Sequence, residues 1–152
     1  MRKLLLVLLL SLPVLALPTP EEVVVKLYRS HLKNQELGKT VAQVPGCFTP
    51  EFLALLNKAL EKRAVDTDLF THQKSKMTDF ELGNTAVQTT QAQVHLQIWA
   101  GDRVGQQNRD PQNATIYLVD LQEGKGYQIE DIQFQTRPRF KVADFLKSLV
   151  GS

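Results

Sequence analysis

The chain has 152 residues, with 18 lysines and arginines against 16 aspartates and glutamates. Its length fits one domain with a buried core. Arg2 and Lys3 lie in an N-terminal segment that we expect to be removed, which leaves 16 charges of each sign on the mature chain. A neutral chain lacks the basic excess of nucleic-acid-binding proteins, so the composition argues against nucleic acid as a partner.

Residues 1–16 have the pattern of a secretory signal peptide. A basic start is followed by an unbroken apolar run from Leu4 to Leu10, which continues more weakly to Ala16. The run is shorter than the roughly 20 residues that span a bilayer, and no cysteine directly follows it that could carry a lipid. We therefore expect cleavage after Ala16, export to the periplasm or the medium, and one soluble mature domain over residues 17–152 without a membrane span.

Two stretches have the sequence of a helix start. In Thr19-Pro20-Glu21-Glu22 the threonine can cap, the proline suits the first helical position, and the second glutamate completes a capping box. Apolar residues at helical spacing then predict a helix to about Asn34. Residues 35–48 predict a loop that contains Cys47, the only cysteine, which cannot form an internal disulfide. We expect a small, partly buried filler there, and a thiol that pairs with a partner or reacts is the alternative. Thr49-Pro50-Glu51 begins a second helix by the same chemistry.

In the second half of the chain the spacing of apolar residues changes from helical to alternate positions. Phe80-Glu81-Leu82 predicts a short strand that ends at Gly83-Asn84. From Gln91 to Trp99 apolar and polar residues alternate, which predicts a strand with one apolar and one polar face. Residues 101–113 predict a long loop.

The centre of the predicted sheet is a hairpin formed by residues 115–121 and 127–134, joined by a turn that contains two glycines. In its second strand Ile129 and Ile132 are three residues apart, which breaks strict alternation. A β-bulge near Glu130-Asp131 would place both isoleucines in the core.

Residues 140–149 predict a short closing helix. The sequence thus predicts an α+β fold, with two N-terminal helices packed on a curved antiparallel sheet of about four strands. Pro20 to Tyr28, Asp66 to Phe70 and Tyr127 to Ile132 carry a resemblance to a known family. On these residues the chain resembles the bacterial envelope family called domain of unknown function 3828, within the nuclear-transport-factor-2-like (cystatin-like) superfamily.

The resemblance implies a fold and an export route. In the cystatin-like fold a curved sheet wraps a long N-terminal helix and leaves a conical pocket. Members of the family have an aromatic residue where Tyr127 stands, followed by an isoleucine and an Asp-Ile pair. Some members carry a lipid-attachment cysteine that this chain lacks, and this departure puts membrane anchoring in doubt.

In such a cone a carboxylate on the concave face can anchor a ligand or act as a general base, and Asp131 is the candidate. Tyr28 and His31 lie one turn apart on the first helix and, with Tyr127, complete the expected ligand-binding set. The resemblance implies a precedent for catalysis, because isomerases and dehydratases of the superfamily use a carboxylate in that cone. The alternatives are an Asp131 that is turned outward or bonded to backbone amides, and a His31 that is a satisfied core histidine.

Asp66, Asp68 and His72 together suggest a metal site. No second histidine or cysteine stands at ligand spacing, so turn formation or capping is the expected role of these residues. We expect no metal and no cofactor.

Gln93, Gln97 and Trp99 lie on the polar face of their predicted strand. An uncharged sheet face with a tryptophan can form a homodimer or receive another partner, and an ordinary solvated face is the alternative. We therefore expect an exported binding or interaction domain of the bacterial envelope, which takes a small apolar ligand or another envelope protein. The rival hypothesis is a small pocket enzyme that uses Asp131 as its general base.

Overall fold

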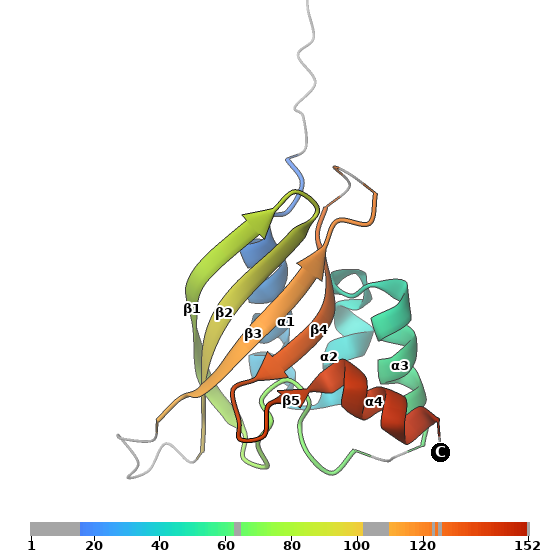
Figure 1. Cartoon of the computed structure of the whole chain (residues 1–152). Helices are drawn as coiled ribbons and strands as arrows, with labels where there is room; N and C mark the ends of the chain where they lie inside the picture. The colour runs from blue at the N-terminus through green and yellow to red at the C-terminus, as the bar shows by residue number, and fades with distance from the viewer. Residues whose placement is uncertain (1–15, 63–64, 102–109, 123, 125, 152) are drawn as a thin grey trace, which may run out of the picture.

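A computed structural model describes residues 16–62, 65–101, 110–122, 124 and 126–151. The described residues form one antiparallel sheet in which each strand pairs with its neighbour in sequence (Figure 1). The predicted α+β class and antiparallel sheet are confirmed. The elements in chain order are α1 (Pro20–Asn34), α2 (Leu37–Gln43), the short 3-10 helix η1 (Pro45–Cys47), α3 (Pro50–Glu61), β1 (Met77–Gln88), β2 (Gln91–Ala100), β3 (Gln112–Val119), β4 (Gln128–Phe134), β5 (Phe140–Lys141) and α4 (Val142–Val150).

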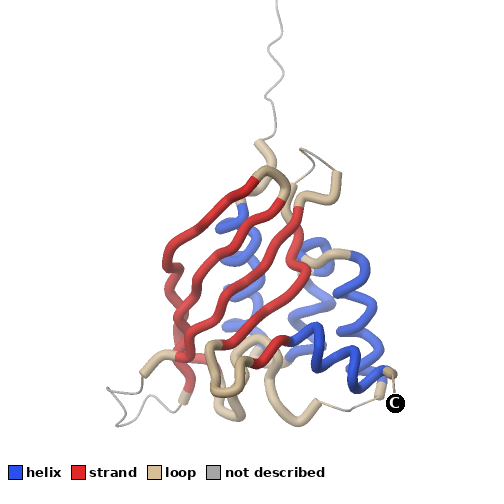
Figure 2. The backbone as a smooth tube through the Cα atoms, viewed as in Figure 1, coloured by secondary structure: helices blue, strands red, loops and turns tan. Residues whose placement is uncertain are grey.

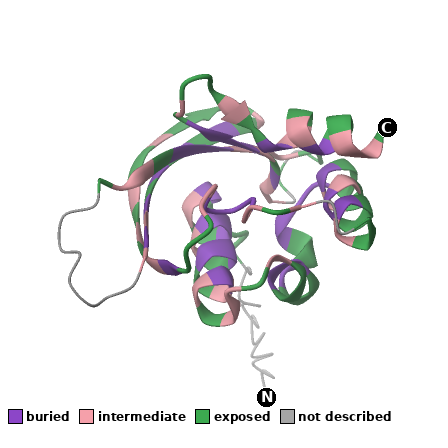
Figure 3. Ribbon diagram, turned by 90° about the horizontal axis from the view of Figure 1, so that it is seen from below, coloured by how far each residue is buried: buried purple, intermediate pink, exposed green. Residues whose placement is uncertain are grey.

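The helices leave the two faces of the sheet in different surroundings. We call the face that packs on α1 the inner face, and Figure 3 shows the sheet curving around this helix. Helices α2, α3 and α4 lie beside the β4 edge of the sheet (Figure 2). Across the described part of the chain, no helix covers the outer face of β1, β2 and β3 in Figure 1.

Helix α1 begins and ends as its sequence requires. The capping box is present: the Thr19 hydroxyl accepts from the amide of Glu22 at 3.3 Å, and the Glu22 carboxylate accepts from the amide of Thr19 at 2.8 Å. The helix ends at Gln35, which has a left-handed φ of 55°. The Gln35 side-chain amide accepts from the amide of Met77 at 2.9 Å and donates to its carbonyl at 2.8 Å. This pair of bonds joins the end of α1 to the start of β1.

The sheet has a fifth strand, β5, which Phe140 and Lys141 form where the closing helix was expected to begin. Two further boundaries differ from the prediction. Part of the predicted loop 35–48 forms α2, because the helix buries Thr40 and Val41 although it has no side-chain cap. Strand β1 does not end at Gly83-Asn84, because these residues lie in an irregularity of the β1–β2 pairing between Leu82 and Thr85, and the strand continues beyond them. In both cases packing against a neighbouring element overrides a weak local signal.

The predicted bulge in β4 is confirmed. Ile129 pairs with Leu118, Asp131 pairs with Tyr117, and the register shifts between these two pairs, so Glu130 is the extra residue. Both Ile129 and Ile132 are fully buried on the inner face. The predicted alternation of β2 is confirmed as well, since its burial alternates residue by residue from Gln91 to Ile98.

The space between α1 and the inner face is filled by side chains. The region where the conical pocket was expected therefore contains buried side chains of the protein's own core. The largest side chains that are almost completely buried there include Tyr28, Phe48, Phe52, Phe70 and Phe134.

The bulge predicts a specific outcome for a one-residue deletion. Deleting Glu130 removes the extra residue, so one of the two isoleucines has to leave the core, and we expect a loss of about 2–4 kcal/mol of unfolding free energy. The control is Glu130→Ala, which keeps the bulge and changes only an exposed side chain, and should cost less than about 0.5 kcal/mol. Urea unfolding monitored by circular dichroism measures the unfolding free energy of both variants. A similar loss of unfolding free energy in the two variants would contradict the role of the bulge.

Candidate functional site

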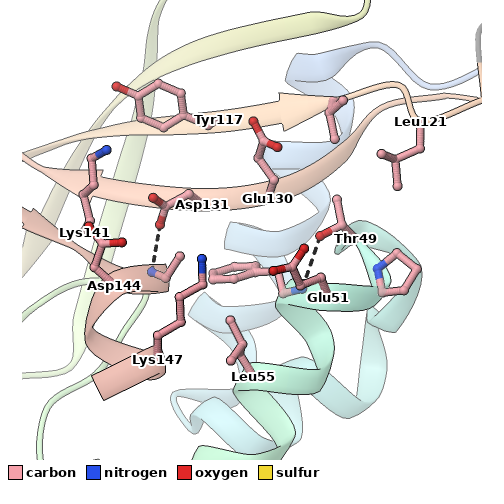
Figure 4. A pocket seen from close by; sticks show the side chains of 14 residues that line it. Thr49, Glu51, Leu55, Tyr117, Leu121, Glu130, Asp131, Lys141, Asp144 and Lys147 are labelled. Atoms are coloured by element: carbon pink, nitrogen blue, oxygen red, sulfur yellow. Dashed lines mark hydrogen bonds between the residues drawn. The ribbon is translucent and has the colours of Figure 1, made fainter. Parts of the chain in front are cut away.

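Two cavities meet at the start of α3. The first, of about 540 Å³, lies between β3, β4, the start of α3 and the start of α4 (Figure 4). The second, of about 460 Å³, lies between the start of α1, η1 and the loop that follows β3. Pro50 and Leu121 line both cavities. We call the two cavities together the α3 groove, the first cavity its α4 arm and the second its α1 arm.

Strand β4 holds the start of both helices that border the α4 arm. The carbonyl of Ile129 accepts from the amide of Thr49, the N-cap of α3, at 2.9 Å. One carboxylate oxygen of Asp131 accepts from the amide of Ala143, in the first turn of α4, at 2.9 Å. The same oxygen accepts from the amide of Ile132 at 2.8 Å. Asp131 thus caps α4 from a neighbouring strand, which was one of the predicted alternatives for this residue.

Burial has the largest effect on the pKa of Asp131. Removal from water raises the pKa of its carboxyl group, and the nearby Asp144 carboxylate acts in the same direction. The two backbone amides and the Lys141 ammonium act against this rise, but the pKa remains above its ordinary value.

The α4 arm combines charged walls with apolar surface. Figure 4 shows Glu51 and Lys147 extending from the two helices toward the strand that carries Glu130 and Asp131. The remaining charged groups of this arm are Lys141 and Asp144, and its apolar surface comes from Phe52, Leu55, Tyr117, Val119 and Leu121.

The α1 arm contains Tyr127, whose hydroxyl donates to the carbonyl of Thr89 at 3.4 Å. Glu22 and Lys26 of α1 contribute charge to this arm. Cys47 lines it but is only 3% exposed, and burial raises the pKa of its thiol. The residue is therefore a neutral, buried side chain, as predicted, and does not have the low pKa of a reactive cysteine.

Tyr28 and His31 lie elsewhere, so the predicted grouping with Asp131 is wrong. Both are completely buried in the core beneath the inner face. Asp131 faces outward with Tyr117, because the bulge that buries the two isoleucines turns it away from α1. The predicted ligand-binding set is divided: Tyr127 and Asp131 line the two arms of the α3 groove, whereas Tyr28 and His31 stabilise the core.

Tyr28 and His31 bind the connector that follows α3. The Tyr28 hydroxyl donates to the carbonyl of Phe70 at 2.9 Å, and burial raises the pKa of this tyrosine well above its ordinary value. Nε2 of His31 lies 2.6 Å from a carboxylate oxygen of Asp68. The other Asp68 oxygen accepts from the amide of Phe70 at 2.8 Å, which confirms the predicted turn role.

The other nitrogen of His31, Nδ1, lies 3.0 Å from the hydroxyl of Thr40. The order Thr40, His31, Asp68 resembles a catalytic triad, but Thr40 is completely buried and its hydroxyl donates to the carbonyl of Glu36 at 2.9 Å. The Thr40 hydroxyl is within hydrogen-bonding distance of both Nδ1 of His31 and the carbonyl of Glu36, so it joins the imidazole to the backbone of α2. The arrangement is a buried polar network that holds three segments together.

The residues predicted for the outer face are where the sequence placed them. Gln93 and Gln97 are exposed, and Trp99 is half-buried beside Asp79 of β1. The Gln97 amide donates to the side-chain oxygen of Asn113 at 3.4 Å. These residues do not line either arm of the α3 groove.

Asp66, Asp68 and His72 do not form a metal site. The His72 ring is stacked on Phe134, with ring centroids 5.2 Å apart, and tilted against Phe140, with centroids 4.2 Å apart. Burial lowers the pKa of His72. Within the described ranges, no group of three or more His, Cys, Asp or Glu side chains could hold a metal ion. The same ranges contain no helix that is long and apolar enough to cross a bilayer.

The sequence did not identify most residues of the groove. Glu51 was recognised only as part of a helix start, and Asp144 and Lys147 were not singled out within the predicted closing helix. The sequence signal that could have pointed to the groove is Leu121, an apolar residue shortly before the glycine-containing turn. In the structure the Leu121 side chain is 56% exposed. An exposed large apolar side chain beside a cavity is the feature that marks such a site.

Two substitutions of Asp131 separate its charge from its capping bonds. At pH 7 Asp131→Asn keeps an oxygen for both amides and removes a buried charge, so we expect stability equal to or above that of the unmodified protein. Asp131→Ala leaves both amides without an acceptor and should cost about 1–2 kcal/mol. Thermal unfolding of the three proteins measures this, and an asparagine variant as unstable as the alanine variant would contradict it.

The difference in stability between Asp131→Asn and the unmodified protein should depend on pH, and its sign follows from the pKa of Asp131. Because the pKa of Asp131 is raised in the folded state, protonation stabilises the fold, and this contribution is complete below the ordinary value of 3.8 and is lost as pH rises through the folded value. The advantage of the asparagine variant should therefore be absent below pH 3.8 and should grow as the pH rises above it.

In comparisons with known proteins, no family model, curated protein or solved structure matches this chain. The function is therefore argued from the geometry of the groove and the chemistry of its residues.

Proposed function

We propose that the chain is an exported binding domain of the bacterial envelope and that its partner occupies the α3 groove. Cleavage after Ala16 releases the mature domain into the periplasm or the medium. The basic start and the apolar run within residues 1–16 support export.

The observation that carries the proposal is the position of Leu121. This side chain is 56% exposed and lines both arms of the groove. Each arm has a volume within the roughly 300–1,000 Å³ range of ligand pockets. An apolar side chain that water surrounds at the centre of a groove gains free energy when a partner covers it. Tyr127 and Asp131, one in each arm, were predicted to bind a ligand from the sequence alone.

The proposal includes the cystatin-like fold and the envelope family that the sequence resembles. The curve of the sheet around α1 supports this assignment. The binding site differs from the expected one, because the filled core leaves the partner to bind outside the cone. The buried aromatic side chains between α1 and the sheet argue against a small apolar ligand inside the cone.

A second surface is the outer face around Gln93, Gln97 and Trp99. One observation favours it: Trp99 is only half-buried on a face that carries no helix across the described residues in Figure 1. Tryptophan is enriched in interfaces, so this face is the candidate for a homodimer or for another envelope protein.

The rival function is a pocket enzyme of the isomerase or dehydratase type. One observation favours it, because Asp131 lines a cavity and burial raises its pKa, as is common for a general base. Against it, one oxygen of Asp131 already accepts from two amides, and neither Tyr28 nor His31 lies near it to assist proton transfer. A structural cap explains Asp131 without catalysis.

Site-specific photo-crosslinking tests the proposal in the living source organism. A photoreactive amino acid replaces Leu121 in one variant and Gln93 in a matched variant, both at exposed positions. We expect a crosslinked partner at position 121 and none at position 93, because only the first position lies in the groove.

A product at position 93 alone would transfer the function to the outer face. No product at either position would contradict the binding proposal for both surfaces. The enzyme hypothesis is tested by expressing Asp131→Asn and Leu121→Ser in a strain that lacks the gene. If Asp131→Asn is as stable as the unmodified protein but does not restore the phenotype, while Leu121→Ser does, the result would favour catalysis.

A further inference from the structure

We infer that a neutral sugar chain binds across the outer face of the sheet, in a depression at the irregularity of β1. The inference goes beyond the proposed function, because no residue that lines this depression also lines either arm of the α3 groove. Three features carry it: a row of uncharged amide side chains, a tryptophan beside that row, and the charge around it.

The depression has a volume of about 370 Å³ and lies where β1 departs from regular pairing. The register of β1 against β2 shifts between Leu82 and Thr85. Gly83 and Asn84 therefore both stand opposite His95. A Cβ atom at Gly83 would lie 3.3 Å from Cβ of His95. The glycine thus leaves space above the imidazole that a larger side chain would fill.

Amide side chains form a row across the strands at this depression. Gln97 of β2 pairs with Asn113 of β3 and with Glu81 of β1. The backbone amide of Gln135, directly after β4, donates to the carbonyl of Asn113 at 3.0 Å, so Gln135 continues the row. Asn84 adds a fourth amide side chain to the lining. All four amide-bearing residues are exposed.

These amides have hydrogen-bonding capacity that the fold does not use. Within the described part of the chain, the side chains of Asn84 and Gln135 have no hydrogen-bond partner. The side-chain amide of Gln97 reaches Asn113 only at 3.4 Å. Each amide side chain offers two donor hydrogens and a carbonyl acceptor without carrying a charge. Sugar hydroxyl groups both donate and accept, so they match this set of groups.

The spacing of the row fits an extended sugar chain. Neighbouring strands lie about 4.8 Å apart, so the row presents a new side chain at that interval. This interval is close to the length of one ring in an extended chain of pyranose sugars. A sugar chain that runs across the strands therefore places successive rings over Gln97, Asn113 and Gln135.

Trp99 lies beside the row. It follows Gln97 by two residues on the outer face of β2 and is half-buried, so part of the residue is open to solvent. The C–H groups on one face of a pyranose ring form an apolar surface that packs on an aromatic ring. The tryptophan thus offers a stacking surface next to the hydrogen-bonding groups of the amides, and a sugar uses both.

The charge of the depression favours a neutral ligand. Glu81 carries the only carboxylate in the lining that the structure describes, and that lining contains no lysine or arginine. A phosphate group or an acidic sugar would meet this carboxylate without a cation to balance it. A protein partner is disfavoured as well, because most of the lining side chains are polar, whereas the centre of a protein interface is apolar.

The fluorescence of Trp99 tests the inference on the mature protein without a label, because the sequence contains one tryptophan. The probes are three oligosaccharides of equal length: a glucose oligomer and an N-acetylglucosamine oligomer, which are neutral, and a galacturonic acid oligomer, which is acidic. We expect a saturable change in fluorescence with a neutral oligomer. At low salt the acidic oligomer should bind about tenfold more weakly or not at all.

Protein variants locate the binding. Gln97→Ala with Asn113→Ala removes two amides of the row and should weaken the binding of the neutral oligomer about tenfold. The matched control is Gln88→Ala with Gln91→Ala, which removes two exposed amides outside the depression and should leave the affinity unchanged. Trp99→Ala should bind about fivefold more weakly, as measured by isothermal titration calorimetry. Circular dichroism shows that each variant is folded.

Three results would overturn the inference: no binding of either neutral oligomer, equal binding of the acidic oligomer, or equal weakening by the two pairs of substitutions. If no sugar binds and position 93 crosslinks to a protein in the cell, the outer face is a protein interface instead. None of these results changes the expectation for position 121, because that residue lies in the α3 groove.

Discussion

The β-bulge at Glu130 is the constraint on which the rest of the structure depends. One extra residue allows both Ile129 and Ile132 to enter the core and turns Asp131 to the outer side of β4. From this short stretch the strand fixes two helices, because the Ile129 carbonyl accepts from the N-cap of α3 and the Asp131 carboxylate accepts from the first turn of α4. The α3 groove is the space between these elements, so a packing requirement of the core also builds the candidate site.

The polar residues of the core have a structural role that is easily mistaken for a catalytic one. Tyr28 and His31, one turn apart on α1, bond to Phe70 and Asp68 of the connector between α3 and β1. Every buried side-chain nitrogen or oxygen among the described residues has a hydrogen-bond partner. If this network is broken, buried polar groups lose their hydrogen-bond partners in the protein interior, which costs free energy. These bonds therefore hold the connector in one position.

Local signals allowed the sequence to predict the caps of α1 and α3, the alternation of β2 and the bulge of β4, because each depends on residues within one turn or one strand. The contact of His31 with Asp68 joins residues 37 positions apart, and no local pattern encodes it. For the same reason the cap that Asp131 provides to Ala143 was only one of several alternatives. The predicted Tyr28, His31 and Asp131 grouping failed because it assumed an open cone, whereas the aromatic side chains fill it.

Amide hydrogen exchange of the mature protein, measured residue by residue by NMR, tests the central claim most directly. The account predicts that the amides of Thr49 and Ala143 exchange slowly, although both stand at helix starts where amides normally lack partners, because the carbonyl of Ile129 and the carboxylate of Asp131 accept from them. Exchange of either amide at the rate of an unprotected chain would show that β4 does not hold the two helices, and the α3 groove would lose its structural basis.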